Sequence, residues 1–418
     1  MTRPAPRFRI ALALTAALLA ARALAAAPLT DPLGSPLPVG LHLHAPALYL
    51  VLGPLFSIWD GASMLSMTRL HGFLLGTALL YLLWRLARVA FGRTGPFRPL
   101  HELAVLGASL AGFALFLALG LLWHRPMLAL AGAGPDRAVV DFHSHTNVSH
   151  DVRGTLMSGF DVRANLAWHR RAGFDAVFVT DHNTIAPAVP AGGLPLRCPG
   201  LEVSAWRAHI VLLGDTLPVD RGPYSRDWTG LARLLAVSDS AYHARSVASL
   251  PEYENNHWER LDSLVASGLD GFEIVNASPK ANELSRARRD SVVSLARRSG
   301  RFVVGVSDHH GWGATSMVWN LVPAAAWRAN PSTLCGRILD RLDQGVESVQ
   351  IVERHRLRAD SAWPSLLTPL GVVWETWRGM PGLLTLSWLV WIWGIPLAMS
   401  ARGRGRRDII PPPQSRTS

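Results

Sequence analysis

The stretch Asp141-Phe142-His143-Ser144-His145-Thr146 decides the fold that we expect for this chain. It predicts an apolar strand that ends in two imidazoles, with the carboxylate of Asp151 one short loop later. Because side chains alternate along a strand, His143 and His145 point the same way and can bind one metal ion. A neutral imidazole is also the commonest protein metal ligand. The spacing alone is weak support, since His42-x-His44 repeats it in a proline-rich leader without an acidic partner.

Residue types that bind metals recur at other short apolar segments. The segment 174–180 is followed by Asp181-His182-Asn183, and the segment 302–306 by Ser307-Asp308-His309-His310. Glu202 lies within the apolar run 200–204, and His209 opens the next run. Short strands separated by helix-length segments predict a parallel β/α fold, which builds its sites at the carboxyl ends of the strands. The sequence therefore predicts an α/β protein with a metal site at these strand ends.

These motifs resemble those of the PHP (polymerase and histidinol phosphatase) domain. The family's signature is Asp-Leu-His-x-His-Thr with a following Ser-Asp or Ser-x-Asp, then Thr-Asp-His, a Gly-x-Glu strand, a His-Pro and a late Asp-x-His. Matching residues lie at 141–146, 149–151, 180–182, 200–202 and 308–310. The resemblance covers residues 139–355. It implies a distorted (β/α)7 barrel with two or three divalent metal ions, usually zinc, manganese or iron, and phosphoester cleavage.

The resemblance implies eight metal ligands in this chain. They are His143, His145, Glu202 and Asp308 for the first metal, Glu202 as a bridge and His209 for the second, and Asp151, His182 and His310 for the third. His150 occupies the aspartate position of the Ser-Asp version of the motif, so that His150 and Asp151 compete for one role. We favour Asp151.

The clear departure from the family pattern is Leu250, which stands where relatives carry the histidine of His-Pro. Leucine cannot bind a metal, so the second site lacks one donor. Either this site is empty and the centre holds two metals, or His257 or Glu252 substitutes, or the alignment has slipped here. We predict fewer than three tightly bound metal ions per chain.

Other residues are candidates for catalysis and substrate binding. Asp308 and His309 are the candidate catalytic residues, and His309, flanked by two ligands, either protonates the leaving oxygen or orients its neighbours. The candidates for substrate binding are Arg207, Lys280 and Asn276. Arg207 and Lys280 could contact phosphate, with a solvated surface charge as the alternative. Asn276 ends a predicted strand, where it either faces the site or only makes structural hydrogen bonds.

The rest of the chain points to a membrane. Hydrophobic residues make up 49% of the sequence and charged residues 17%, which is apolar for a soluble enzyme. The runs 70–90, 103–123 and 383–399 are long enough to cross a bilayer. The run 10–27 is either a first span or a cleaved signal peptide, and 45–67 is read as half-inserted or interfacial. The predicted regions are a membrane region at 1–136, a metallohydrolase domain at 137–360, and a final span with a basic tail at 361–418.

The net charge of +11 does not indicate nucleic-acid binding, because residues 137–360 hold 25 of the 41 basic and 24 of the 30 acidic residues. The excess lies around the spans. Arginines predict that one loop and the C-terminal tail are cytoplasmic, namely Arg85, Arg88, Arg93 and Arg98, and Arg402, Arg404, Arg406 and Arg407. One span separates each of these two sets of arginines from residues 137–360. This predicts that the domain at 137–360 lies outside the cytoplasm.

We therefore expect a membrane-anchored, metal-dependent phosphoesterase that acts on a small-molecule or envelope phosphoester. A metal-dependent hydrolase of a non-phosphate bond and a degenerate sensor or binding module are the alternatives. Cys198 and Cys335 are too few for a disulfide framework, and we expect free thiols.

Overall fold

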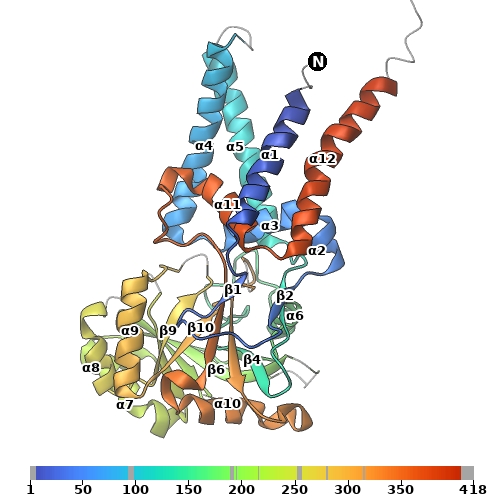
Figure 1. Cartoon of the computed structure of the whole chain (residues 1–418). Helices are drawn as coiled ribbons and strands as arrows, with labels where there is room; N and C mark the ends of the chain where they lie inside the picture. The colour runs from blue at the N-terminus through green and yellow to red at the C-terminus, as the bar shows by residue number, and fades with distance from the viewer. Residues whose placement is uncertain are drawn as a thin grey trace, which may run out of the picture.

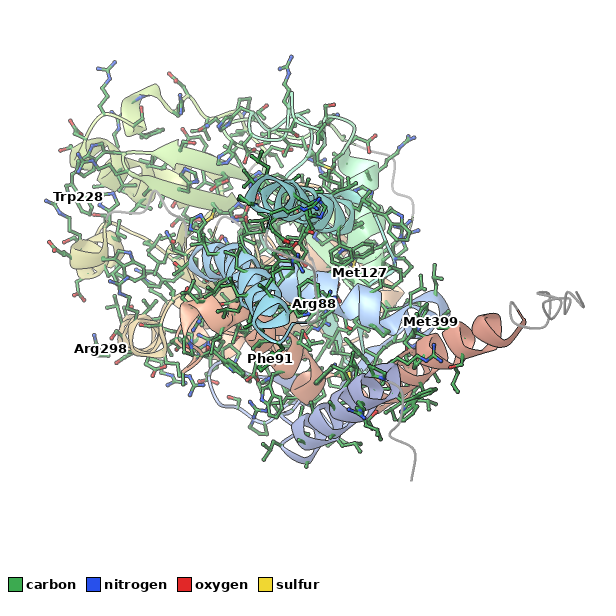
Figure 2. All side chains as sticks on the ribbon, turned by 90° about the horizontal axis from the view of Figure 1, so that it is seen from above. Arg88, Phe91, Met127, Trp228, Arg298 and Met399 are labelled. Atoms are coloured by element: carbon green, nitrogen blue, oxygen red, sulfur yellow. A yellow bond between two sulfur atoms is a disulfide. The ribbon has the colours of Figure 1, made fainter. Side chains whose placement is uncertain are left out.

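The computed structural model describes residues 6–92, 98–188, 193, 195–214, 216–251, 257–278, 281–313 and 316–405, with side chains up to residue 401. Figure 1 shows a sheet with flanking helices and, on one side of it, long helices that run away from the sheet. Seen from above, two of these helices, α4 and α5, stand apart from the other two, α1 and α12 (Figure 2). The four are α1 (Pro6–Ala23), α4 (Met67–Ala90), α5 (Pro99–Leu122) and α12 (Gly382–Gly405).

Ten strands form one curled sheet in the order β1-β12-β11-β4-β5-β6-β7-β8-β9-β10. Two parallel blocks, β4 to β6 and β8 to β10, are joined through β7, which runs antiparallel to both neighbours. The strands are β1 (Leu29–Thr30), β4 (Arg137–Asp141), β5 (Ala176–Val179), β6 (Leu196–Ala205), β7 (Ala208–Leu213), β8 (Arg245–Ser249), β9 (Gly271–Asn276), β10 (Phe302–Val306), β11 (Val318–Pro323) and β12 (Gln350–Arg354). β2 (His42–His44) and β3 (Ala129–Ala131) pair separately.

The mixed α/β class is confirmed, but the expected count of seven β/α units is not. β6 and β7 are joined by the two residues Trp206 and Arg207, which leave no room for a helix. Arg207 adopts a left-handed backbone conformation with φ of 51°, as short hairpin turns require. β11 likewise runs antiparallel to β4 and β12. Reversed strands therefore replace part of the regular β/α alternation.

The two blocks of strands meet through the buried amide of Asn320 in β11. Its Oδ1 accepts from the Gly305 backbone N–H at 2.9 Å, and its Nδ2 donates to the carbonyls of Gly305 and Val140 at 2.6 and 2.9 Å. β10 is not paired with β11 or β4 in the sheet order. The Asn320 side chain thus satisfies backbone groups on both sides of this seam, which β4 and β10 do not pair across as neighbouring strands.

Two of the helices around the sheet show clear capping signals at both ends. Asp161 accepts from the backbone N–H of Ala164 at 2.8 Å at the start of α6, and Gly173 ends that helix in the left-handed conformation. Ser285 and Gly300 have the same roles for α9. The helices around the sheet are α6 (Val162–Ala172), α7 (Trp228–Tyr242), α8 (Leu261–Ala266), α9 (Arg286–Ser299) and α10 (Leu334–Leu342).

Three helices are long and apolar enough to cross a membrane: α4, α5 and residues Gly382–Ala401 of α12. They match the three runs that the sequence singled out. Large apolar side chains such as Leu83, Leu115 and Leu386 are more than half exposed along them. Exposed apolar surface of this kind is typical of helices that associate with a membrane.

The fourth long helix, α1, is fastened to the rest of the protein. The Nη1 of Arg22 donates to the carbonyls of Trp377, Arg378 and Met380, each at 3.0 Å, at the end of α11 (Thr368–Gly379). Leu18 is fully buried, and β1 extends the sheet beyond β12. These contacts tie α1 and the residues that follow it to α11 and to the edge of the sheet.

The segment 45–67 forms two short helices, α2 (Ala47–Val51) and α3 (Gly53–Ser63), which join the long helices to the sheet (Figure 1). Asp60 is fully buried there. It binds Arg125 at 2.6 Å, Arg354 at 2.8 Å and the hydroxyl of Tyr49 at 2.6 Å. A carboxylate within the segment predicted to be half-inserted or interfacial is therefore the centre of a buried ion-pair network.

The expectation of free thiols is wrong, because Cys198 and Cys335 form a disulfide. Cys198 lies in β6 and Cys335 in α10, 137 residues later. The bond ties a central strand to the helix that covers the end of the sheet remote from the long helices (Figure 1). Nothing local to either cysteine marks this pairing, which depends on the folded chain.

Replacing both cysteines by serine is expected to lower the free energy of unfolding by about 2–5 kcal/mol, because the bond closes a long loop in the unfolded chain. Thermal unfolding with and without a reductant measures this. The reductant should destabilise the wild type and leave the double variant unchanged. Two reactive thiols in the unreduced, denatured wild type would contradict the prediction.

Candidate metal centre

The eight side chains predicted as ligands lie together where strands of the sheet end. His143 and His145 follow β4, His182 follows β5, and Asp308 and His310 follow β10, while Glu202 and His209 face each other from β6 and β7. Their ligand atoms form three overlapping groups, each within 4.8 Å: His143, His145 and Asp308; His182, Glu202 and His209; and His145, Asp151, His182 and His310. The structure thus brings together all eight residues from segments up to 167 positions apart.

In the first group, the ligand atoms of His143, His145 and Asp308 lie close together, and a carboxylate oxygen of Glu202 lies beside them. The Nε2 atoms of His143 and His145 are 2.9 Å apart, and they lie 3.5 and 3.1 Å from Oδ1 of Asp308. Oε2 of Glu202 lies 3.2 and 3.3 Å from the same two nitrogens. Ligand atoms about 2.1 Å from a tetrahedral ion are about 3.4 Å apart, so these spacings fit one bound cation.

Glu202 links the first group to the second. Its Oε2 also lies 3.2 Å from Nδ1 of His182, and its Oε1 lies 2.8 Å from Nδ1 of His209. This carboxylate therefore faces four imidazoles, with one oxygen shared between the two groups. That is the arrangement the resemblance implied for a bridging ligand.

Asp151 and His310 build the third group. Oδ2 of Asp151 is 2.5 Å from Nε2 of His310 and 3.5 Å from Nε2 of His182. The ring of His145 lies 4.3 Å from that of His310, measured between centroids. His182 thus presents one nitrogen to each of two groups.

The charge state of the centre also fits a cation. Burial lowers the pKa of His145, but the carboxylates of Asp308 and Glu202 outweigh it and raise that pKa to about 10. Burial raises the pKa of Asp308, but His143 and His310 outweigh it and lower that pKa. His145 Nδ1 and Glu202 Oε1 are buried without a hydrogen bond. Without a metal the site therefore holds protons between its carboxylates, and a divalent cation can take their place.

All donors in the three groups are imidazole nitrogens and carboxylate oxygens. This donor set suits zinc, manganese or iron and lacks the thiolates of a structural zinc site. The groups therefore fit divalent metal binding.

Backbone hydrogen bonds fix the ligands that come from distant parts of the chain. The N–H of Asp308 donates to the carbonyl of His143, and the N–H of His145 donates to the carbonyl of His309, both at 2.9 Å. Asp308 has a positive φ of 45°, a strained conformation for a residue other than glycine. Such strain is typical of functional sites, where the surrounding structure holds it in place.

Glu273, a buried carboxylate in β9, supports the first group, although it is not among the residues predicted for the site. Its Oε1 accepts from Nδ1 of His143 at 2.6 Å, and its Oε2 accepts from the hydroxyl of Ser249 at 2.5 Å. With the Nδ1 proton held there, Nε2 of His143 presents its lone pair to the first group. Carboxylates that orient a metal-binding histidine in this way raise its basicity. A lone acidic residue inside an otherwise apolar strand was the available signal.

Replacing Glu273 by glutamine is expected to weaken metal binding by about 10- to 100-fold, as loss of such an orienting carboxylate usually does. The glutamine keeps the size of the side chain but removes the charge that fixes the imidazole. Titration of the metal-free protein against a chromogenic chelator measures the affinity. Glu347→Gln, an exposed carboxylate, is the control. Equal affinities for both variants would contradict the prediction.

Two of the candidate catalytic and substrate residues have other contacts. Nδ2 of Asn276 donates to Oδ2 of Asp308 at 3.2 Å, so Asn276 orients a ligand instead of facing a substrate. His309 points away from the three groups and stacks on Trp168, with ring centroids 5.2 Å apart and planes at 9°. Burial holds the pKa of His309 well below its usual range, which leaves the ring neutral.

Three of the remaining candidates, Arg207, His257 and His150, are described by the structure and do not belong to the three groups. Arg207 is exposed on the β6–β7 turn and stacks over Trp206. His257 is paired with the carbonyl of Trp206 at 2.8 Å, and His150 is exposed beside His182. Lys280 and Glu252 lie outside the described residues. The second group is completed by His182, without a donor at the position of Leu250.

Comparisons with known proteins give distant structural similarity. No family model matches the chain, and no curated protein sequence does. PsfC from Pseudomonas syringae is 16% identical with a TM-score of 0.36, and the match covers 58% of this chain and 98% of that one. A "putative metal-dependent phosphoesterase" from Bifidobacterium adolescentis (16%, TM-score 0.28, 42% and 88% covered) and an amidohydrolase from Chromobacterium violaceum (16%, 0.25, 46% and 96%) also match. The function proposed below therefore rests on the geometry of the site.

Proposed function

We propose that this protein is a metal-dependent hydrolase that cleaves a phosphomonoester or phosphodiester. The observation that carries the proposal is the convergence of eight imidazoles and carboxylates into three overlapping groups that share Glu202, His145 and His182. Divalent metals in such a centre supply Lewis-acid catalysis and a nucleophile at neutral pH. The resemblance of the motifs to the PHP domain supports a phosphoester over other bonds.

The side chains of this centre orient its ligands and leave one side open. Glu273 holds the Nδ1 proton of His143, and Asn276 holds Oδ2 of Asp308, so that Nε2 and Oδ1 face each other. The side chains of Asp151 and His209 are 16% and 12% exposed, whereas the other six ligands are at most 6% exposed. A substrate therefore approaches past Asp151 and His209, with water excluded from the opposite side.

A screen of phosphomonoesters and phosphodiesters with purified, metal-stripped protein tests the proposal. Hydrolysis should appear when manganese or zinc is added and disappear with a chelator. If only a non-phosphate ester or amide is hydrolysed, the protein is the alternative, a metal-dependent hydrolase of a non-phosphate bond. Metal binding without hydrolysis of any compound would indicate a sensor or binding module.

The centre is predicted to hold two metal ions per chain. A neutral imidazole has one lone pair, and His182 points Nδ1 at Glu202 and Nε2 at Asp151. His182 can therefore serve the second or the third group, but not both. Elemental analysis after dialysis measures the stoichiometry, with His257→Ala as a control outside the groups. Three tightly bound ions in both proteins would contradict the prediction.

An extracytoplasmic position of the sheet region is part of the proposal. Arg85 and Arg88 lie near the end of α4 remote from the sheet, the end that Figure 2 views from above. Positive charge marks the cytoplasmic side of membrane proteins. The Cys198–Cys335 disulfide supports the same assignment, because such bonds persist in oxidising compartments and are rare in the cytosol.

A further inference from the structure

The metal centre lies at the end of the sheet that faces the membrane helices. β12 ends at Arg354, which binds Asp60 of α3, and the next residue, His355, binds Glu375 of α11 at 2.9 Å. β4, β5 and β10 run in the same direction as β12, since β11 is antiparallel to both β4 and β12. The ligands that follow β4, β5 and β10 therefore lie on the membrane side of the sheet.

A ligand-bearing loop touches the end of a membrane span directly. The backbone N–H of Gly313 donates to the carbonyl of Leu121 in α5 at 3.2 Å, and Nε2 of His124 lies 3.2 Å from the carbonyl of Gly311. Gly313 is three residues beyond His310, so that chain length alone keeps the two within about 11 Å. The metal centre is therefore held beside the last turn of α5.

That position corresponds to the head groups of a bilayer. The 24 residues of α5 extend about 36 Å, which exceeds a hydrocarbon core of about 30 Å by a few ångströms. The head-group layer adds about 5–8 Å on each side of that core. A centre within about 11 Å of the end of α5 is at the depth of lipid phosphates, or just above it.

The loop between Asp151 and Phe160 carries an exposed apolar residue on the same side. Leu156 is 82% exposed, and it lies five residues after the ligand Asp151. Phe160, at the end of this loop, packs against Gly311, next to the contact with α5. An exposed leucine beside a membrane surface is suited to contact lipid.

We infer that the substrate is a membrane lipid with a phosphoester in its head group, cleaved in the leaflet on which the metal centre lies. This inference rests on the proposed function and narrows its substrate class. A membrane anchor and a centre at head-group depth raise the effective concentration of such a lipid far above that of the same head group in solution.

Proteoliposomes with the full-length protein, loaded with manganese, test the inference. The probes are phosphatidylglycerol vesicles containing phosphatidic acid, which offer a phosphodiester and a phosphomonoester. Their soluble counterparts are glycerophosphoglycerol and glycerol 3-phosphate. Lipid in the same vesicles as the protein should be cleaved about 100-fold faster than lipid in separate vesicles, the gain expected from a shared surface. Cleavage of the soluble compounds but not of the lipids would overturn the inference and leave the proposed function intact.

A matched pair of variants distinguishes the effect of contact with the bilayer from the effect of catalysis at the metal centre. Leu156→Glu should lower lipid cleavage about tenfold, because it removes an apolar contact with the bilayer, and should leave the soluble compounds unaffected. The control is Leu217→Glu, at a leucine 45% exposed shortly after β7. β7 ends at the opposite end of the sheet, since it is antiparallel to β6. Equal losses for both variants, or cleavage independent of which vesicle holds the lipid, would overturn the inference. No cleavage of lipid or soluble compound would overturn the proposed function as well.

Discussion

Replacing His143 and His145 together by alanine is expected to abolish metal binding at the first group and to lower phosphoester hydrolysis by about 10³-fold or more. Both imidazoles face Asp308 and Glu202 within 3.5 Å, so their loss leaves two carboxylates to hold the cation. Metal catalysis contributes several kcal/mol, and about 4 kcal/mol corresponds to three decades in rate. Metal content and the initial rate, measured on the same preparation, check the prediction.

The chain offers a matched control in His42→Ala/His44→Ala. These two histidines have the same spacing on β2, but both are exposed, and neither belongs to the three groups. The control variant should keep wild-type metal content and rate. If the His143→Ala/His145→Ala variant also kept the wild-type metal content and rate, the assignment of the site would be refuted.

Replacing Asp60 by asparagine is expected to lower the free energy of unfolding by about 3–5 kcal/mol, the usual cost of breaking a buried ion pair. The amide leaves the buried guanidinium groups of Arg125 and Arg354 without their counter-charge. Because Asp60 joins α3 to the end of β12, the loss should also loosen the sheet from the membrane helices. Thermal unfolding in detergent, followed by tryptophan fluorescence, measures the change.

Asp343→Asn is the control for this prediction. Asp343 binds Arg245 at 2.6 Å, but its side chain is 49% exposed, and exposed ion pairs contribute about 0–1 kcal/mol. The control should therefore unfold close to the wild type. A shift in Asp60→Asn no larger than the shift in Asp343→Asn would show that the buried network does not stabilise the fold.

Seven of the eight predicted ligands could be identified from the sequence because they lie in or shortly after short apolar strands. The alternation of side chains along an extended chain places His143 and His145 together. Asp308, His309 and His310 lie beyond the end of β10, and Asp308 has a left-handed backbone conformation, so strand alternation does not fix the directions of their side chains. The stacking of His309 on Trp168 is visible only in the folded chain.

The rest depends on contacts between distant segments, which no local pattern contains. The reversed strands β7 and β11 look apolar in the sequence, like the parallel strands, and only their pairing shows the direction. The Cys198–Cys335 bond and the ion pairs of Asp60 with Arg125 and Arg354 join residues more than 60 positions apart. The three helices that are long and apolar enough to cross a membrane could be predicted because length and composition alone define them.

Anomalous scattering from crystals of the full-length protein soaked in manganese locates the metal ions themselves. We expect one peak about 2.0–2.2 Å from the facing atoms of His143, His145 and Asp308, and a second peak in one of the other two groups. The first peak should be absent from crystals of the His143→Ala/His145→Ala variant. Manganese bound elsewhere, with no peak between His143, His145 and Asp308, would show that these residues do not form the metal centre.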